Sequence, residues 1–401
     1  MRNFSICLSA ALIAAAGLPA VIIAQENARL TADSTKPAEK PVTPPKPTAA
    51  PIDFSGVVFG NYQYQGAAGP TKDQNKFDVE RAYLTFRMPA GDRASIRVTG
   101  DLFQQTSSPN DSYYKGWVLR AKYAYLQYNF LTPAKSTDWG AVGRIGLIHT
   151  MFIDHEENFW PRWLSQTPVE RAGFFSSADA GVAGIVTLPN KFGELYTAIT
   201  NGPGYTSRET DRFKDFQGRL TVTPLANSDV SYLRTFALDG WVYRGTIASK
   251  YVVITDPSQV GPVGSGLARN RWGLFAGIRD PRLIVGVDYA NRTDGRDTGL
   301  NTLASPRGVT DSTGRLFSAY TVIKPFQIAD AKSTIPLGIV ARYDNVKPNS
   351  VTDDHYNIFI GGLTWDLSKK TAISLDYQGQ TRKGTLVPVT RTYYLHWVAN
   401  F

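Results

Sequence analysis

Cysteine is almost absent from this chain of 401 residues, because Cys7 is the only one. Cys7 lies inside an N-terminal segment with the features of a secretory signal, in which Arg2 supplies a positive charge and residues 6–23 are mostly apolar. Ala24 offers a small residue after which cleavage is expected. We therefore predict a signal peptide over residues 1–24 and an exported chain without disulfides or thiolate metal sites.

Long apolar runs are also missing, since no stretch beyond residue 24 approaches the roughly 18 uninterrupted apolar residues of a transmembrane helix. Histidine is scarce, with four in the chain, and no nucleophile motif accompanies them. The group His149, Asp154, His155 and Glu156 matches no metal-ligand spacing. The glycine-rich residues 261–266 lack the Lys and Ser or Thr of a phosphate loop. We therefore predict neither enzymatic activity nor a metal or cofactor.

Proline and lysine are concentrated in one segment that follows the signal. Residues 31–51 hold six prolines and three lysines, too little apolar surface to fold. We expect residues 25–51 to form an extended, disordered periplasmic tail, and a tether to an acidic partner is the alternative. No second linker divides the rest, so residues 52–401 are predicted to form one domain.

Within that domain, segments of about ten residues alternate between apolar and polar side chains, which is typical of transmembrane β-strands. In one of them Leu337, Ile339 and Ala341 alternate with Val340, Arg342 and other residues of the opposite face. Arginines and aspartates recur on that opposite face in strand after strand, and a dry interior would make them costly. A water-filled lumen removes this cost.

The connections between these segments alternate between short turns and long loops. The short turns cover residues 89–92, 131–138, 189–191, 224–228, 280–281, 326–333 and 368–370. The long loops cover residues 66–76, 105–116, 149–179, 201–213, 238–267, 293–312, 346–354 and 382–389. Fifteen connections predict sixteen strands, and sixteen leave room for an aqueous channel.

One segment complicates this count. Residues 251–255 (YVVIT) have strong β propensity and would make a seventeenth strand. Bacterial single-chain barrels have an even number of strands, so we assign this segment to the fifth long loop and keep eighteen strands as the alternative. The predicted fold is an all-β, 16-stranded antiparallel transmembrane β-barrel with short periplasmic turns and long extracellular loops.

The third long loop, residues 149–179, is the chemically densest part of the chain. It contributes acidic and basic side chains that can face basic residues on the inner wall. Opposed charges across a narrow aqueous passage order and filter permeating solutes. The candidate pore residues are Arg81, Arg97, Arg120, Lys122, Arg219 and Arg342 on the wall, and Asp154, Glu156, Glu157 and Arg162 on the loop.

Three patterns resemble one family. They are the strand KFDVERAYLTF followed by a short turn and RASIRVTGDL, the loop ending VERAGFFSSADAGVA, and a C-terminal strand that ends on Phe401. Residues 52–401 thereby resemble Gram-negative outer-membrane porins of the phosphate-selective O/P type and their general-porin relatives. The resemblance implies a trimeric or monomeric channel in the cell outer membrane through which small hydrophilic solutes and ions diffuse passively. It also implies that the third loop narrows the pore.

The C-terminal strand also resembles the assembly signal of outer-membrane barrels. Tyr393, Leu395, Trp397, Ala399 and Phe401 occupy every second position. This face is expected to meet outer-membrane lipid, and the strand is expected to pair with the first strand near residues 54–64. Trp397 and Phe401 are the residues that the barrel-assembly machinery would read.

The net charge bears on selectivity. Five basic and three acidic residues precede residue 52, so +7 of the formal +9 belongs to the barrel, which predicts a modest anion preference. A phosphate channel of the O/P type is expected to carry an arginine ladder and a lysine cluster, but the lysines of the long loops are scattered. A general diffusion porin is therefore favoured.

The basic residues form no single patch, which disfavours nucleic acid as a partner. A non-channel barrel acting as adhesin or cell-wall anchor is the alternative function.

Overall fold

A computed structural model describes residues 52–105, 116–209, 211–248, 266–297, 309–350, 354–384 and 389–401. The predicted signal peptide, the Lys/Pro-rich tail, residues 251–255 and most of the glycine-rich segment lie outside these ranges. Within the described ranges no helix is long and apolar enough to cross a membrane.

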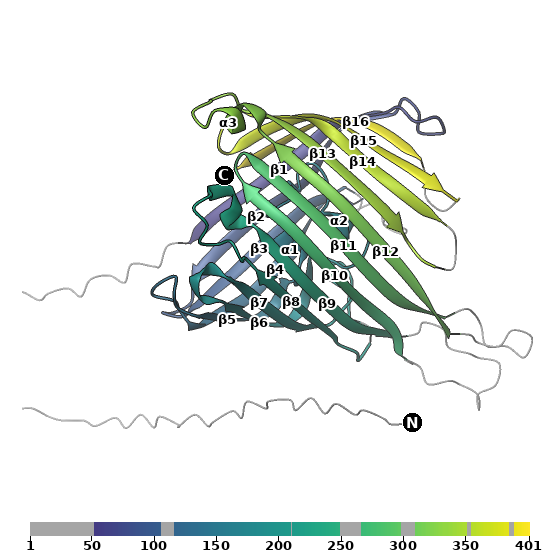
Figure 1. The fold of residues 1–401 in the computed structure, drawn as a ribbon. Helices are drawn as coiled ribbons and strands as arrows, with labels where there is room; N and C mark the ends of the chain where they lie inside the picture. The colour runs from purple at the N-terminus through teal and green to yellow at the C-terminus, as the bar shows by residue number, and fades with distance from the viewer. Residues whose placement is uncertain are drawn as a thin grey trace, which may run out of the picture. The chain divides into compact units, whose positions relative to one another are not determined.

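The described chain forms a closed barrel in which each strand pairs with its neighbours in sequence and β1 pairs with β16 (Figure 1). Every pairing is antiparallel, and the predicted count of sixteen strands is confirmed. The strands are β1 Asp53–Gln65, β2 Asn75–Pro89, β3 Ala94–Gln105, β4 Gly116–Leu131, β5 Gly140–His149, β6 Ala178–Thr187, β7 Gly193–Thr200, β8 Asp215–Val222, β9 Ala237–Ala248, β10 Gly266–Asp280, β11 Leu283–Asp297, β12 Val309–Ile323, β13 Leu337–Lys347, β14 His355–Asp366, β15 Thr371–Lys383 and β16 Thr390–Asn400.

The ninth strand lies elsewhere than the sequence predicts. The predicted turn at residues 224–228 would start a strand at residue 229, but residues 223–236 form a longer connection with a 3-10 helix, η3 Ser231–Thr235. Arg234 Nε closes this connection by donating to the Ser228 carbonyl at 2.6 Å. The strand is Ala237–Ala248, which the sequence assigns to the fifth long loop. Two further short helices, η2 Pro189–Lys191 and α3 Pro325–Ala329, lie in turns at the same end of the barrel.

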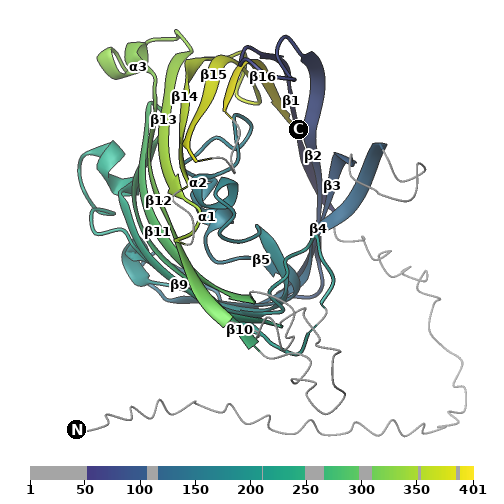
Figure 2. The ribbon, with the colours of Figure 1, turned by 90° about the vertical axis from the view of Figure 1, so that its right-hand side faces the viewer.

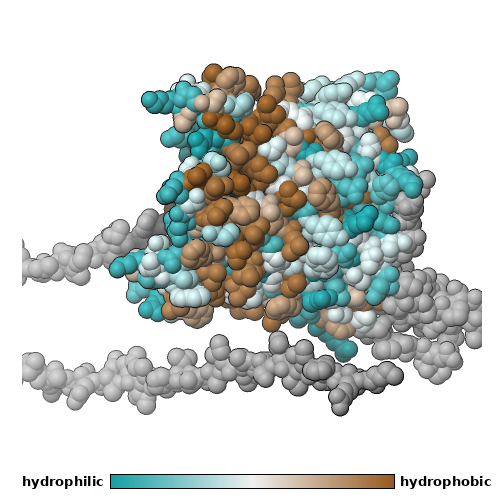
Figure 3. Space-filling model, viewed as in Figure 1, coloured by the Kyte–Doolittle hydropathy of each residue, from teal (hydrophilic) through white to brown (hydrophobic). Residues whose placement is uncertain are grey.

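The two faces of the barrel wall follow the predicted alternation. In β13, Ile339 and Tyr343 are exposed on the outer surface, whereas Val340, Arg342 and Asp344 point inward and are buried. Apolar side chains gather in a band over the outer surface of the strands, with polar residues at the barrel ends (Figure 3). Such a band is what a hydrocarbon layer requires of a transmembrane barrel.

The seam between β16 and β1 closes the barrel. Tyr64 faces Tyr393 and Val58 faces Ala399 in its register, which confirms the predicted pairing. The backbone of Phe401 extends the seam by exchanging two hydrogen bonds of 3.0 Å with Gly56. The Phe401 ring packs over Gly56, where a Cβ atom would overlap it. A Cβ atom at Gly60 would instead overlap the backbone carbonyl of Asp78 on β2.

The third long loop, residues 150–177 (L3), lies inside the barrel (Figure 2). It carries two short helices, α1 Ile153–Glu156 and α2 Pro168–Arg171. Many of its apolar side chains are buried against aromatic and aliphatic residues of the wall. Those of Phe152, Ile153, Trp160, Leu164 and Val169 share one buried cluster with Trp241, Phe275, Leu316 and Tyr320 of the wall. L3 therefore covers the inner face of β9–β13 with a dry layer, and open space is left beside β1–β4.

Candidate functional site

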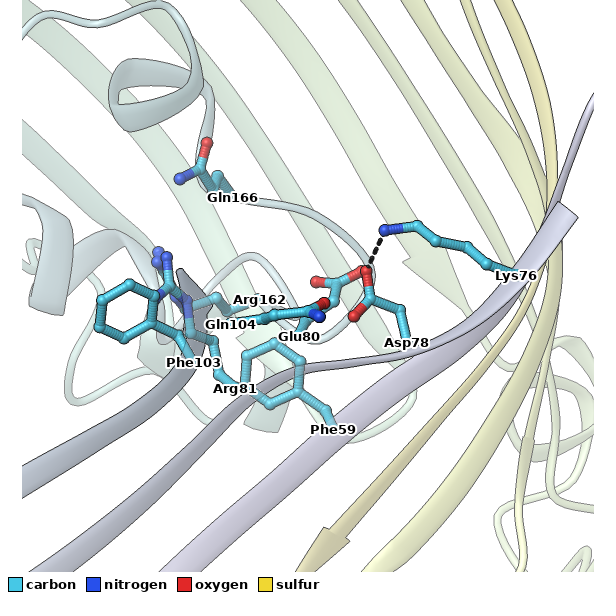
Figure 4. A pocket seen from close by; sticks show the side chains of 9 residues that line it. All are labelled: Phe59, Lys76, Asp78, Glu80, Arg81, Phe103, Gln104, Arg162 and Gln166. Atoms are coloured by element: carbon cyan, nitrogen blue, oxygen red, sulfur yellow. Dashed lines mark hydrogen bonds and ion pairs between the residues drawn. The ribbon is translucent and has the colours of Figure 1, made fainter. Parts of the chain in front are cut away.

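Three cavities lie in a row between L3 and the wall formed by β1–β4. The first, of about 340 Å³, is lined by Lys76, Asp78, Glu80 and Arg81 near the long-loop end (Figure 4). The second, of about 590 Å³, shares Phe59 and Arg162 with the first and extends to the short turn at residues 368–370. The third, of about 360 Å³, shares Val57, Tyr83 and Glu157 with the second and ends at Phe401. Because neighbouring cavities share lining residues, the three form a row from the long-loop end of the barrel to the short-turn end, which we call the passage.

Adjacent cavities share Phe59 and Arg162 at one junction and Tyr83 and Glu157 at the next, and we call these four residues the neck. Phe59 and Tyr83 pack edge to face on the wall with their ring centroids 6.1 Å apart. From L3, Arg162 Nη2 donates to Glu170 at 3.2 Å, and Arg162 Nη1 lies 3.2 Å from Glu157. The neck thus places two aromatic rings on one side and a rigid set of charged groups on the other.

Two β-bulges turn charged residues toward the passage. In the β3–β4 ladder, Thr99 pairs with Tyr123 and Gly100 with Ala121, so Lys122 is the extra residue of a bulge. Lys122 and Tyr123 are consequently both buried on the inner face. The same irregularity in the β1–β2 ladder makes Glu80 an extra residue beside Arg81.

Opposite charges face each other across the third cavity of the passage. On the wall, Arg97 contacts His149 at 3.0 Å, and Lys122 lies 3.9 Å from Glu157 of L3. His149 in turn lies 3.1 Å from Asp154 of L3. Although removal from bulk water alone would raise it, the pKa of Asp154 is lowered, because His149, Arg97 and Lys122 favour the carboxylate. Asp154 therefore remains ionised near neutral pH and contributes a fixed negative charge.

Arg81 and Arg120 are joined through one buried carboxylate. Asp101, which is fully buried, accepts hydrogen bonds from Arg81 at 3.3 Å and from Arg120 at 3.0 Å. The Tyr205 hydroxyl, from the loop between β7 and β8, lies 3.2 Å from the same carboxylate. The Arg120 guanidinium is held between the rings of Phe103, at 3.8 Å, and Tyr205, at 4.6 Å. Arg120 thus fixes a loop to the wall, while Arg81 borders the first cavity.

Not every predicted pore residue borders the passage. The six that line it are Arg81, Arg97, Lys122, Asp154, Glu157 and Arg162. Arg219 lies on the other side of the start of L3, where it donates to the Met151 carbonyl at 2.5 Å and pairs with Glu194. Arg342 and Glu156 are buried in the layer beneath L3. Arg342 there contacts Asp344 at 2.6 Å and the Gln166 carbonyl at 2.7 Å.

Several residues that line the passage are absent from the predicted set: Phe59, Asp78, Glu80, Tyr83, Phe103, Trp163 and Gln166. The aromatic residues among them are not predicted because the candidate pore residues are selected by their charge. The signal that identifies Glu80 is a break in alternation, because Glu80 and Arg81 are adjacent in sequence yet both polar within a strand. Such a break is typical of a bulge that brings two neighbouring side chains to one face.

No protein-family model and no curated protein matches this chain. Solved structures do match its fold. An anion-selective porin from Comamonas acidovorans has a TM-score of 0.59 at 8% identity, covering 88% of this chain and 100% of that one. The outer membrane channel DcaP of Acinetobacter baumannii has a TM-score of 0.59 at 14% identity, covering 89% and 99%. The trimer form of OmpT from Vibrio cholerae has a TM-score of 0.55 at 10% identity, covering 88% and 100%. The chain therefore has the 16-stranded barrel fold found in general porins of the outer membrane.

Proposed function

We propose that this protein is an outer-membrane porin through which small hydrophilic solutes and ions diffuse passively. The observation that carries the proposal is the passage between L3 and β1–β4, which runs from the long-loop end to the short-turn end. Its lining of charged and amide groups suits hydrated solutes, and the apolar outer band suits lipid. The porin-like fold supports the same function. In this proposal the short turns face the periplasm.

The proposed channel prefers anions modestly. Eight basic and five acidic side chains line the three cavities. The basic ones are Lys76, Arg81, Arg97, Lys122, Arg162, Lys324, Lys369 and Lys370, and the acidic ones are Asp78, Glu80, Asp154, Glu157 and Asp366. Most of the basic groups near the neck already contact a carboxylate, as Arg162 contacts Glu157 and Glu170. This pairing favours a general diffusion porin over a phosphate-specific channel.

Planar-bilayer recording tests the proposal. The purified protein should produce discrete, ohmic conductance steps, and the reversal potential in a salt gradient should have the sign of an anion-preferring pore. A folded barrel that produces no steps would contradict the proposal and favour an adhesin or anchor with a closed lumen.

Changing one charge at the neck should change ion selectivity in a direction set by its sign. Replacing Arg162 with Gln removes a positive charge from the neck and leaves Glu170 without this ion pair, so the ratio of anion to cation permeability should fall about twofold to threefold. Glu80→Gln, which removes a negative charge from the same passage, is the matched variant and should raise the ratio. Reversal potentials in a potassium chloride gradient measure both effects. A shift of the same sign in the two variants would rule out electrostatic control at this neck.

A further inference from the structure

Glu156 of L3 and Asp288 of β11 form an unusual contact beneath the constriction loop. Both side chains are almost completely inaccessible, at 0% and 1% exposure. None of their four carboxylate oxygens has a well-oriented hydrogen-bond donor among the residues that the structure describes, although the Thr167 side chain lies beside Glu156. The hydroxyls of Thr167 and Tyr320 lie beside the pair and are also buried without a well-oriented partner.

Arg342 offsets only part of the negative charge of this pair. Arg342 lies in the same layer, but its Nε and Nη2 donate to Asp344 and its Nη1 donates to the Gln166 carbonyl. Two ionised carboxylates side by side in such a buried site would be strongly unfavourable. One proton removes most of that cost, because a neutral carboxyl group can donate a hydrogen bond to the remaining carboxylate.

We propose that Glu156 and Asp288 share one proton across the interface between L3 and the wall, and that this proton holds the constriction loop in place. Glu156 occupies a structurally sensitive position, since its carbonyl accepts hydrogen bonds from Phe159 at 2.8 Å and Trp160 at 3.0 Å. Trp160 is the fully buried anchor that packs edge to face on Tyr320 of β12. The proposal rests on the porin function above and adds a pH-dependent control of its constriction.

A proton suits this site better than a metal ion. No group of three or more His, Cys, Asp or Glu side chains with metal-binding geometry exists within the described ranges. The side chains of Glu156 and Asp288 interact directly, and the Arg342 guanidinium acts on both of them. A divalent ion would need additional oxygen ligands and would be repelled by this guanidinium.

The other charged groups around the pair are engaged in contacts of their own. From β9, Asp239 contacts His155 of L3 at 3.0 Å, and from β13, Asp344 contacts Arg342. Burial, followed by the charge of Asp288, raises the pKa of Glu156 well above its usual value. The folded state therefore holds this proton more tightly than the unfolded chain does. The shared proton therefore stabilises the position of L3 against the wall fully at acidic pH. This stabilisation is lost as the pH rises through the raised pKa of Glu156.

Single-channel recording from about pH 5 to about pH 10 tests this inference in the full-length protein. At low pH the wild-type channel should stay at its main conductance level. At higher pH the fraction of time that it spends at other conductance levels should rise. Release of one proton limits this rise to about tenfold per pH unit. Glu156→Gln supplies a permanent donor to Asp288, and Asp288→Asn supplies one to Glu156, so each should abolish the pH dependence. Asp330→Asn, an exposed acid in the turn that contains α3, should retain it.

The possible outcomes separate this inference from the proposed function. A folded wild-type barrel without any conductance overturns the porin function, whereas steps that do not change with pH, or change equally in Glu156→Gln, overturn only the shared proton. A wild-type profile that shifts when calcium chloride replaces a chelator would assign the site to a metal ion instead. If a variant fails to fold, infrared spectroscopy of the wild-type protein still tests whether the two carboxyl groups share a proton. It should show a protonated carboxyl band at neutral pH, and absence of that band overturns the proposal.

Discussion

Deleting Phe401 should lower the amount of folded barrel in the outer membrane about tenfold, because the deletion removes the last contacts of the seam. Phe401 exchanges two backbone hydrogen bonds with Gly56, and its ring packs over that glycine and 5.7 Å from the ring of Phe54. The barrels that do assemble should conduct as the wild type does, since the neck is formed by other residues. Heat-modifiable mobility on gels measures the folded fraction, and bilayer recording measures the conductance.

A glycine variant provides a matched control for the seam. Gly56→Leu places a side chain where the Phe401 ring lies and should impair assembly although Phe401 is still present. Gly361→Leu makes the same change on β14 where no atom lies within 4 Å of the new Cβ, and it should assemble normally. Normal assembly of both the truncated chain and Gly56→Leu would show that the seam at Phe401 does not determine assembly.

Replacing Trp160 with Ala should release L3 from the wall without unfolding the barrel. Trp160 is fully buried, its Nε1 donates to the Ser165 carbonyl at 2.8 Å, and its ring faces Tyr320 at 5.2 Å. Loss of a buried tryptophan costs about 3–5 kcal/mol, and here the cost falls on the loop rather than on the strand ladders. Single-channel recordings should show a larger and fluctuating conductance, with gel mobility still that of a folded barrel.

The control for this variant is a tryptophan on the outer surface. Trp272 of β10 is 42% exposed on the lipid-facing side, so Trp272→Ala removes the same side chain without touching L3. Its conductance should match that of the wild type. A quiet, unchanged conductance in Trp160→Ala would mean that the packing beneath L3 does not set the width of the passage.

Most of the barrel can be predicted from the sequence because its signals are local. Alternation along each strand and the contrast between short turns and long loops, together with the even-number rule, determine the count of sixteen. The pairing of β16 with β1 follows from closure. The ninth strand is misplaced because Val230 and Tyr232 are apolar residues exposed in a turn, which mimic the start of a strand.

The pore lining is harder to predict because it depends on tertiary contacts. Within L3, Glu156 and Glu157 are neighbours, yet one is buried against the wall and the other borders the neck. Nothing in their local sequence distinguishes them. Similarly, Arg342 and Arg97 both occupy inward positions of strands, but L3 covers only Arg342. The neck lies beside β1–β4 because the apolar side chains of L3, such as Trp160, pack against the opposite part of the wall.

A cysteine introduced at the neck tests most directly whether solutes pass between L3 and β1–β4. The native chain has no cysteine beyond Cys7 in the predicted signal, so Phe59→Cys gives a single target in the mature protein. A bulky, water-soluble thiol reagent should then reduce the single-channel conductance by about half or more. The same reagent should have no effect on Leu375→Cys, which is 65% exposed on the outer surface. Unchanged conductance after complete labelling of Phe59→Cys would contradict the assignment of this passage as the channel.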